Sequence, residues 1–153
     1  MNGLLQLHAN EIAQPLCTLL RDHRKAEGKL KAYYRKAIDQ MVRHLEYLVV
    51  PGVSVAAQNL ADELGLGDLR QCDWSNGSAR RALSWEHHPP VSDLRVLLSN
   101  LTDPTEDAVR EIIEGAGVYW ITKDENAGLP KHKRGDPVAA YAHINMRHEC
   151  RRT

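Results

Sequence analysis

The chain has 153 residues, of which 42% are apolar and 26% are charged, and its formal net charge is zero. These values are ordinary for one globular domain that needs no disulfide framework. No apolar run approaches the roughly 18 residues of a membrane-spanning helix, which excludes a transmembrane class. The chain contains no Phe, so the core must depend on Leu, Val, Ile and Ala, a composition that favours helices.

The three cysteines and the N-terminal segment bear on the compartment. Cys17, Cys72 and Cys150 are an odd number without a CxxC spacing, as expected for reduced thiols. The first 20 residues lack the basic start of a secretory signal. We therefore expect a soluble, cytoplasmic protein.

Two helical segments are predicted before residue 50. Residues 3–22 place Leu and Ile at near-helical spacing, but Pro15 should divide them into two short helices or bend one helix. Residues 26–50 are the clearest amphipathic stretch, with Leu30 and later apolar residues recurring every three or four positions. The Pro51-Gly52 pair should end this helix at Val50.

The next region alternates between short helices and turns. Ser54 is positioned to cap a helix that Gly65 and Gly67 should end. Residues 68–77 contain several turn-forming residues and predict a loop, which a short helix over residues 78–83 should follow.

The stretch SWEHHPPVSDL, residues 84–94, follows this short helix. Pro89 and Pro90 fix the backbone and push His88 into extended geometry. His87 and His88 should therefore lie on a stiff segment that leads into a helix beginning at Pro90 or Ser92, with leucines on its apolar face.

The remaining chain predicts a further helix, one strand and a short capped helix. Pro104 suits the first turn of a helix for which Thr105 is one capping candidate. Residues 118–121 (VYWI) are the only good strand candidate, and Thr122 with Glu125 fits a capping box for a short helix. A last short helix or extended segment should begin near residue 136.

Charge is distributed unevenly along the chain. Residues 21–47 carry eight basic and four acidic side chains, residues 54–127 carry six and thirteen, and residues 131–153 carry six and two. The basic residues within 25–43 and 131–152 could face phosphates of a nucleic acid. The alternative is that they pair with the acidic middle of the chain or are simply solvated.

Glu86-His87-x-Pro is similar to a short segment of the HNH nucleases. That family would use His87 as a base, with Glu86 or His88 near a metal. Its further ligands would come from positions such as Asn100 and His132 or His143. The structural alternative is that His87 or His88 hydrogen-bonds near the following helix and that Glu86 pairs with Arg80 or Arg81.

Two other chemistries have partial support in the sequence. Zinc could be held by Cys72, Cys150 and the two adjacent histidines, or by the pair His143 and His148 with its suitable spacing. Single-stranded nucleic acid could stack on aromatic residues of the basic helix. The residues concerned are Tyr33, Tyr34, Lys29, Lys31, Arg35 and Lys36. The alternative is that Tyr34 belongs to the core and the cations are ordinary surface side chains.

Three segments, SARRALSWEHHPPVSDL, VYWITKDENAGL and DPVAAYAHINM, together resemble a group of uncharacterised bacterial and phage proteins. These share an EHxxP segment, a T-x-E-E/D-x-x-L motif and a terminal tract like AxYxxxGI. The likeness covers roughly residues 78–146, although Asn126 replaces an acidic residue and Asn145 is displaced. It implies a compact module linked to mobile elements or host defence, and it implies no catalytic residue.

We therefore predict a mainly α fold in a single domain, residues 1–153, with at most a small β element around residues 118–121. Residues 1–67 would form the N-terminal helices and residues 68–153 the half that contains EHHPP. The leading function is binding of a protein partner, for example as an inhibitor of a bacterial immune complex such as an anti-CRISPR, and the alternative is an HNH-like nuclease. The predicted binding residues are Trp85, His87, His88, Arg80 and Arg81, because aromatic and Arg side chains dominate binding hot spots. No cofactor and no resident metal are expected.

Overall fold

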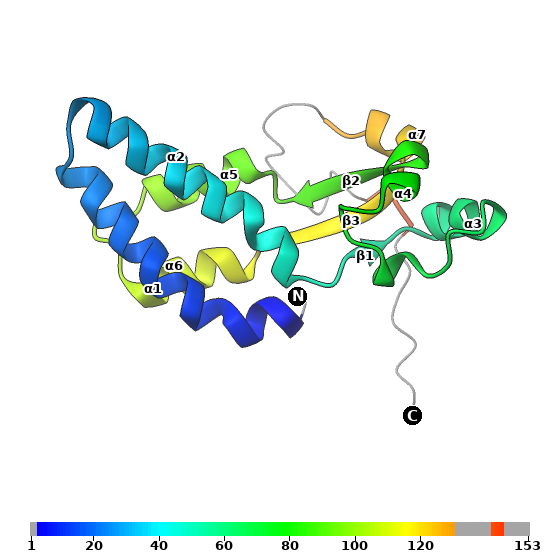
Figure 1. Cartoon of the computed structure of the whole chain (residues 1–153), viewed down its shortest axis with the longest axis horizontal. Helices are drawn as coiled ribbons and strands as arrows, with labels where there is room; N and C mark the ends of the chain where they lie inside the picture. The colour runs from blue at the N-terminus through cyan, green and yellow to red at the C-terminus, as the bar shows by residue number, and fades with distance from the viewer. Residues whose placement is uncertain (1–2, 131–141, 146–153) are drawn as a thin grey trace. The chain divides into compact units, whose positions relative to one another are not determined.

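The computed structural model describes residues 3–130 and 142–145. Within these residues it contains seven α-helices, two 3₁₀ helices and one three-stranded sheet, so the predicted mainly α fold is confirmed (Figure 1). The contacts group the chain into two compact units. Unit 1 comprises Met1–Val49 and Pro89–Gly117, and unit 2 comprises Val50–His88 and Val118–Thr153. The single-domain assignment and its division at residue 67 stay predictions.

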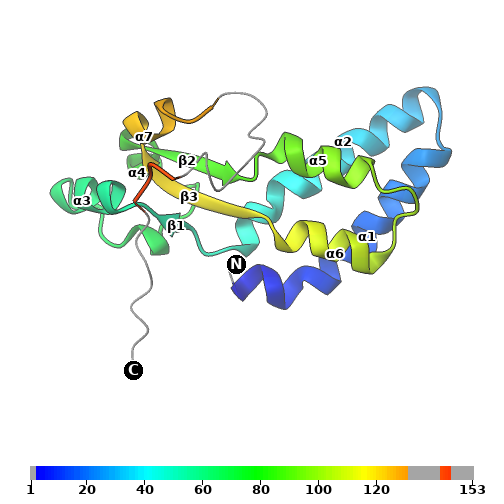
Figure 2. The same cartoon turned by 180° about the vertical axis from the view of Figure 1, so that it is seen from behind.

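Unit 1 is helical. Its elements are α1 (Gly3–Lys25), α2 (Gly28–His44), the 3₁₀ helix η1 (Leu45–Leu48), α5 (Val91–Ser99) and α6 (Glu106–Glu114). Helix α1 packs against α2 and α6, while α5 packs against α2 and α6 (Figures 1 and 2). The fully or almost fully buried core side chains include Ala9, Ala13, Leu16, Leu20, Ile38, Val42, Leu94, Leu98, Val109 and Ile113. Helical periodicity places these side chains on the facing stripes of the four helices.

The first two helices differ from expectation in detail. Pro15 lies inside α1, which continues from Gly3 to Lys25, so the two-helix alternative is wrong. Pro15 is exposed, where water can satisfy the carbonyl group that loses its amide donor. The second helix ends as an α-helix at His44 and continues as η1, because the last turn tightens ahead of Pro51. Leu30 is 53% exposed and does not join the buried face.

Unit 2 contains the sheet, whose strands are β1 (Gly52–Val53), β2 (Leu83–His88) and β3 (Gly117–Thr122), in the order β1-β3-β2. Strand β1 pairs in parallel with β3, with Gly52 opposite Tyr119 and Val53 opposite Trp120. The arrows of β2 and β3 run in opposite directions in Figure 1. The predicted strand at residues 118–121 is confirmed. Strand β2 was not predicted, because SWEHH lacks β-branched residues and is extended through pairing with a distant strand.

Unit 2 also contains four short helices: α3 (Val55–Glu63), η2 (Leu69–Gln71), α4 (Gly77–Ala82) and α7 (Lys123–Ala127). The Ser54 hydroxyl caps α3 by accepting from the amide of Ala57 at 3.0 Å, as predicted. Gly65 and Gly67 adopt φ values of 65° and 76°, which favour glycine. The predicted capping box of Thr122 and Glu125 is also present.

In unit 1, α6 begins at Glu106 with Thr105 as its cap, so Pro104 precedes the helix instead of lying in its first turn. Pro104 is buried, and its carbonyl accepts hydrogen bonds from Cys17 Sγ at 3.1 Å and Arg21 Nε at 2.9 Å. The predicted helix near residue 136 lies outside the described residues.

Gln58 is one of two buried polar side chains in the described part of the chain, the other being Ser54. Its amide nitrogen donates to Asp62 Oδ1 at 2.8 Å and to the carbonyl of Gly67 at 2.9 Å, and its amide oxygen accepts from the Leu69 amide at 3.2 Å. The Gln58 side chain therefore satisfies the backbone groups of Gly67 and Leu69 in the loop that follows α3. No helix among the described residues has the length and apolar character needed to cross a bilayer.

Candidate binding surface

The two adjacent histidines lie on strand β2, where successive side chains point to opposite faces of the sheet. The Trp85 ring packs against Trp120, with ring centroids 4.7 Å apart. On the other face, the centroids of the His88 and Tyr119 rings are 6.0 Å apart. His87 therefore shares the face of Trp85, and His88 lies on the opposite face.

This alternation separates the residues of the predicted anchor patch. Trp85, His87 and His88 are all partly buried, whereas Arg80 and Arg81 on α4 are exposed. The face with Trp85 and Trp120 covers the core cluster beneath α3 and α4, and the other face packs against Leu129 and Ile144. The buried cluster on the Trp120 face consists of Val53, Ala57, Ala61, Leu69, Ala79, Leu83 and Trp120. The five predicted binding residues do not form one exposed patch.

The residues considered for metal binding are likewise not brought together within the described ranges. Over residues 3–130 and 142–145, no group of three or more His, Cys, Asp or Glu side chains could hold a metal ion. His132, His148 and Cys150 lie outside the described residues. Asn100 belongs to unit 1 and the exposed His143 belongs to unit 2.

The loop before α4 is built by local polar contacts that fix its shape. Asp73 Oδ1 accepts from the backbone amide of Ser75 at 2.8 Å and also from the Ser75 hydroxyl. These hydrogen bonds, that of the hydroxyl first, lower the pKa of Asp73 below its ordinary value. Asn76 then caps α4 by accepting from the Ala79 amide at 3.0 Å. Trp120 Nε1 donates to the carbonyl of Cys72 at 2.8 Å, which ties the start of the loop to β3.

Trp74, at the tip of this loop, forms a cation–π contact with Arg80. The guanidinium carbon of Arg80 lies 4.3 Å from the centre of the Trp74 ring, and Trp74 is 42% exposed. A guanidinium stacked on an indole keeps its charge while losing rotational freedom. The contact joins an aromatic surface and a cation in one fixed arrangement.

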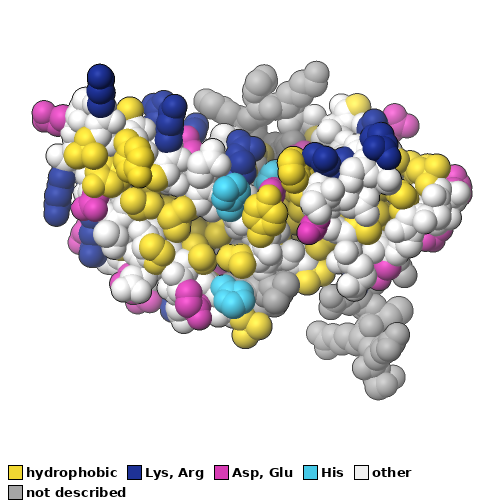
Figure 3. Space-filling model, viewed as in Figure 1, with side chains coloured by type: hydrophobic (Ala, Val, Ile, Leu, Met, Phe, Trp, Pro, Cys, Tyr) yellow, Lys and Arg dark blue, Asp and Glu magenta, His cyan; other side chains and the backbone are white. Residues whose placement is uncertain are grey.

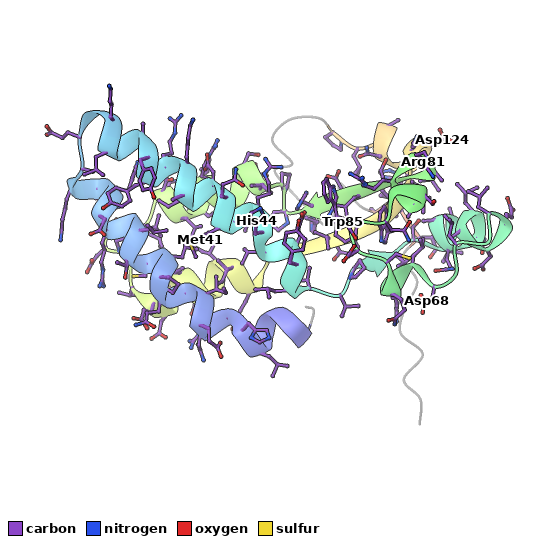
Figure 4. All side chains as sticks on the ribbon, in the orientation of Figure 1. Met41, His44, Asp68, Arg81, Trp85 and Asp124 are labelled. Carbon is purple, nitrogen blue, oxygen red and sulfur yellow. The ribbon has the colours of Figure 1, made fainter. Side chains whose placement is uncertain are left out.

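Arg81 and Lys123 extend the positive charge beside this pair. Lys123 Nζ donates to the carbonyl of Arg81 at 2.6 Å, and an Arg81 Nη atom donates to the Ser78 hydroxyl at 3.1 Å. Figure 4 labels Arg81 on α4 and Trp85 on the adjoining strand β2. We define the α4 surface as the exposed side chains Trp74, Arg80, Arg81 and Lys123.

Sequence reasoning identified Arg80 and Arg81 but missed Trp74 and Lys123. Trp74 lies in residues 68–77, for which the sequence predicted only a loop. A signal was present: the Asp73-x-Ser75 turn followed by the Asn76 cap returns the chain so that position 74 meets the first turns of α4. Lys123 could not be found in this way, since its position depends on the pairing of β2 and β3.

The residues considered for nucleic-acid binding lie on α2. Tyr33 is 66% exposed, Tyr34 is partly buried, and their ring centroids are 5.9 Å apart. The four cations considered with them, Lys29, Lys31, Arg35 and Lys36, are exposed. Hydrophobic side chains also gather over α1 and α2 in Figure 3. The second basic segment, residues 131–152, lies outside the described residues except for 142–145.

Comparisons of the chain with protein-family models, curated proteins and solved structures gave no match. The fold therefore defines only the class, a mainly α protein with a small three-stranded sheet. Function has to be argued from the surface and its chemistry.

Proposed function

We propose that this protein binds a protein partner through the α4 surface. The observation that carries the proposal is the Arg80–Trp74 contact, with 4.3 Å between the guanidinium carbon and the ring centre. Trp and Arg are enriched among residues that dominate binding energy. A pair already held in place loses less conformational entropy when a partner covers it.

The three cations of the surface favour a partner with exposed carboxylates, and the exposed Asp73 and Asp124, which adjoin Trp74 and Lys123 in sequence, reduce the local positive charge. Three of its four side chains are cationic, and a guanidinium can hold a carboxylate with two parallel hydrogen bonds. Trp85 supports the surface from the sheet, since its ring is packed on the fully buried Trp120. His87 and His88 have a structural role in this proposal, as parts of a paired strand.

The resemblance to bacterial and phage proteins suggests which partner to test first. A component of a bacterial immune complex, inhibited when its acidic surface is covered, is the partner that this likeness favours. The nuclease alternative has no supporting cluster within residues 3–130 and 142–145.

The proposal is tested by tagging the protein and recovering partners from a bacterial host. Arg80→Ala and Trp74→Ala should each reduce recovery of the specific partner by at least about tenfold. Arg43→Ala, which removes an exposed cation from α2, is the matched control and should leave recovery unchanged. Equal recovery with all three variants would contradict the proposal.

A nuclease assay tests the alternative separately. Purified protein is incubated with plasmid DNA or RNA and Mg²⁺, Mn²⁺ or Zn²⁺, alongside His87→Ala. The binding proposal expects no cleavage. Cleavage that disappears in the His87 variant would establish the nuclease reading instead.

A further inference from the structure

Unit 1 contains a pocket of about 230 Å³ that is independent of the α4 surface. It lies between α1, α2 and α5. Leu20 and Ile38, each 4% exposed, contribute its apolar lining. Its polar lining comes from His23, Arg35, Asp39, Arg95 and Ser99. Cations beside an apolar wall interact more strongly with an anion than cations surrounded by water do.

Asp39 holds the guanidinium of Arg95 in place. Arg95 Nη1 lies 3.3 Å from Asp39 Oδ2 and 3.5 Å from Asp39 Oδ1, so both contacts use the same nitrogen. The other guanidinium nitrogens make no hydrogen bond to a described residue. Ser99 is one helical turn after Arg95 on α5, which places its hydroxyl on the same side of the helix.

Arg35 supplies a second cation whose charge is not balanced locally. Among the described residues, no carboxylate forms an ion pair with Arg35. The single acid of the pocket, Asp39, pairs with Arg95. Two guanidinium groups and one carboxylate leave the lining with one net positive charge when His23 is neutral.

His23 reports the sign of the electrostatic potential in this region. Burial lowers the pKa of His23, and the positive charges of Lys31, Arg35 and Arg24 lower this pKa further. Of these causes, only the repulsion by the three cations indicates a positive potential that favours an anion, because burial disfavours a charge of either sign.

We propose that this pocket binds a phosphate group, held by the guanidinium groups of Arg35 and Arg95 and the hydroxyl of Ser99. Guanidinium forks match phosphate oxygens in geometry and charge. The pocket is smaller than the roughly 300–1,000 Å³ of typical small-molecule sites, which favours a single phosphate group over a whole nucleotide. The phosphate can come from the free ion or from a small phosphomonoester.

Isothermal titration calorimetry with inorganic phosphate and with ribose 5-phosphate, at constant ionic strength, tests this proposal. Saturable binding at one site per chain is expected for at least one probe. The probe with the higher affinity identifies the source of the phosphate. Arg35→Gln should weaken binding by about tenfold or more, as expected for loss of a charge-assisted hydrogen bond. Lys36→Gln, an exposed neighbour outside the pocket lining, should bind within about twofold of the unchanged protein.

Arg35→Gln decides the outcome, because Arg35 is exposed and its loss should leave the fold intact by circular dichroism. The phosphate affinity of Arg95→Gln gives a second measurement. It is compared with that of Asp39→Asn, which removes the carboxylate that pairs with Arg95. Absence of saturable binding for both probes would overturn the proposal. Binding that Arg35→Gln and Lys36→Gln weaken equally would also overturn it, since that result describes a diffuse surface potential.

Discussion

The two units are stabilised by different kinds of contact. Unit 1 buries aliphatic stripes of four helices, with side chains such as Leu16 and Ile113 completely inaccessible. Both units contain side chains that bind loop backbone, such as Arg21 in unit 1 and Trp120 in unit 2, but unit 2 adds the buried amide of Gln58 to its apolar cluster. The two buried polar side chains of the described residues, Ser54 and Gln58, both belong to unit 2. We therefore expect truncation of a buried apolar side chain to destabilise unit 1, and removal of one buried hydrogen-bonding side chain to destabilise unit 2.

The largest effect is expected for Leu16→Ala in α1. Leu16 is 0% exposed, and its truncation should lower the free energy of unfolding by about 2–5 kcal/mol because it removes buried carbon and leaves a cavity. Urea unfolding followed by circular dichroism measures the change. The control is Leu7→Ala on the same helix, since Leu7 is 71% exposed and should change stability by less than about 0.5 kcal/mol. Similar decreases in the free energy of unfolding for Leu16→Ala and Leu7→Ala would contradict the placement of Leu16 in the helical core.

Gln58→Leu tests the polar support of unit 2. It keeps the side-chain size but leaves the Leu69 amide and the Gly67 carbonyl unsatisfied, at a cost of about 2 kcal/mol. Gln71→Leu, at an exposed position of the same unit, should cost less than about 0.5 kcal/mol. If urea unfolding gives Gln58→Leu the same free energy of unfolding as the unchanged protein, the hydrogen bonds of Gln58 do not stabilise the loop.

Two helix caps allow a direct comparison between the units. Ser54→Ala should cost about 1–2 kcal/mol, because the Ser54 hydroxyl caps α3 and also donates to Glu125 Oε2 at 2.7 Å. Thr105→Ala removes an exposed cap in unit 1 and should cost about 0.5–1 kcal/mol. The difference is measured as a shift of the thermal midpoint. An equal or reversed order would contradict the role of the Ser54–Glu125 contact.

The smallest effect concerns His23 and pH. Because the pKa of His23 in the folded protein lies below the ordinary value of 6.5, the unfolded chain binds the proton more readily. This contribution to stability is complete above pH 6.5 and is lost as the pH falls through the lowered pKa. Arg24, Lys31, Arg35, Asp39 and Arg95 are the charged groups nearby on α1, α2 and α5.

The measurement compares urea midpoints at about pH 5.5 and about pH 7.5. His23→Gln should lose less stability than the unchanged protein between these values. An identical loss in both proteins would assign the pH dependence to other groups.

The sequence predicted unit 1 more completely than unit 2 for a physical reason. In unit 1, helices α2, α5 and α6 follow from local periodicity. The Thr105 cap of unit 1 and the Ser54 and Thr122 caps of unit 2 follow from contacts within three residues. Strand β2 could not be predicted in this way, since residues 83–88 are extended by pairing with β3. The face on which each histidine lies depends on that pairing, so the predicted patch grouped residues of two faces.

The candidate surface was predictable only in part. Arg80 and Arg81 were recognised from the basic pair in α4, but their aromatic neighbour was sought in Trp85, the next tryptophan along the chain. The ring that stacks on Arg80 belongs to Trp74, six residues earlier in sequence. Hydrophobic periodicity does not predict a contact between a loop residue and the helix that follows the loop.

The central claim, that the α4 surface binds a protein partner, is tested most directly by partner affinity measured by biolayer interferometry with Trp74→Ala and Arg43→Ala. We predict that Trp74→Ala raises the dissociation constant at least about tenfold and that Arg43→Ala changes it by less than about twofold. A Trp74 variant that remains folded and binds the partner with unchanged affinity would contradict the account.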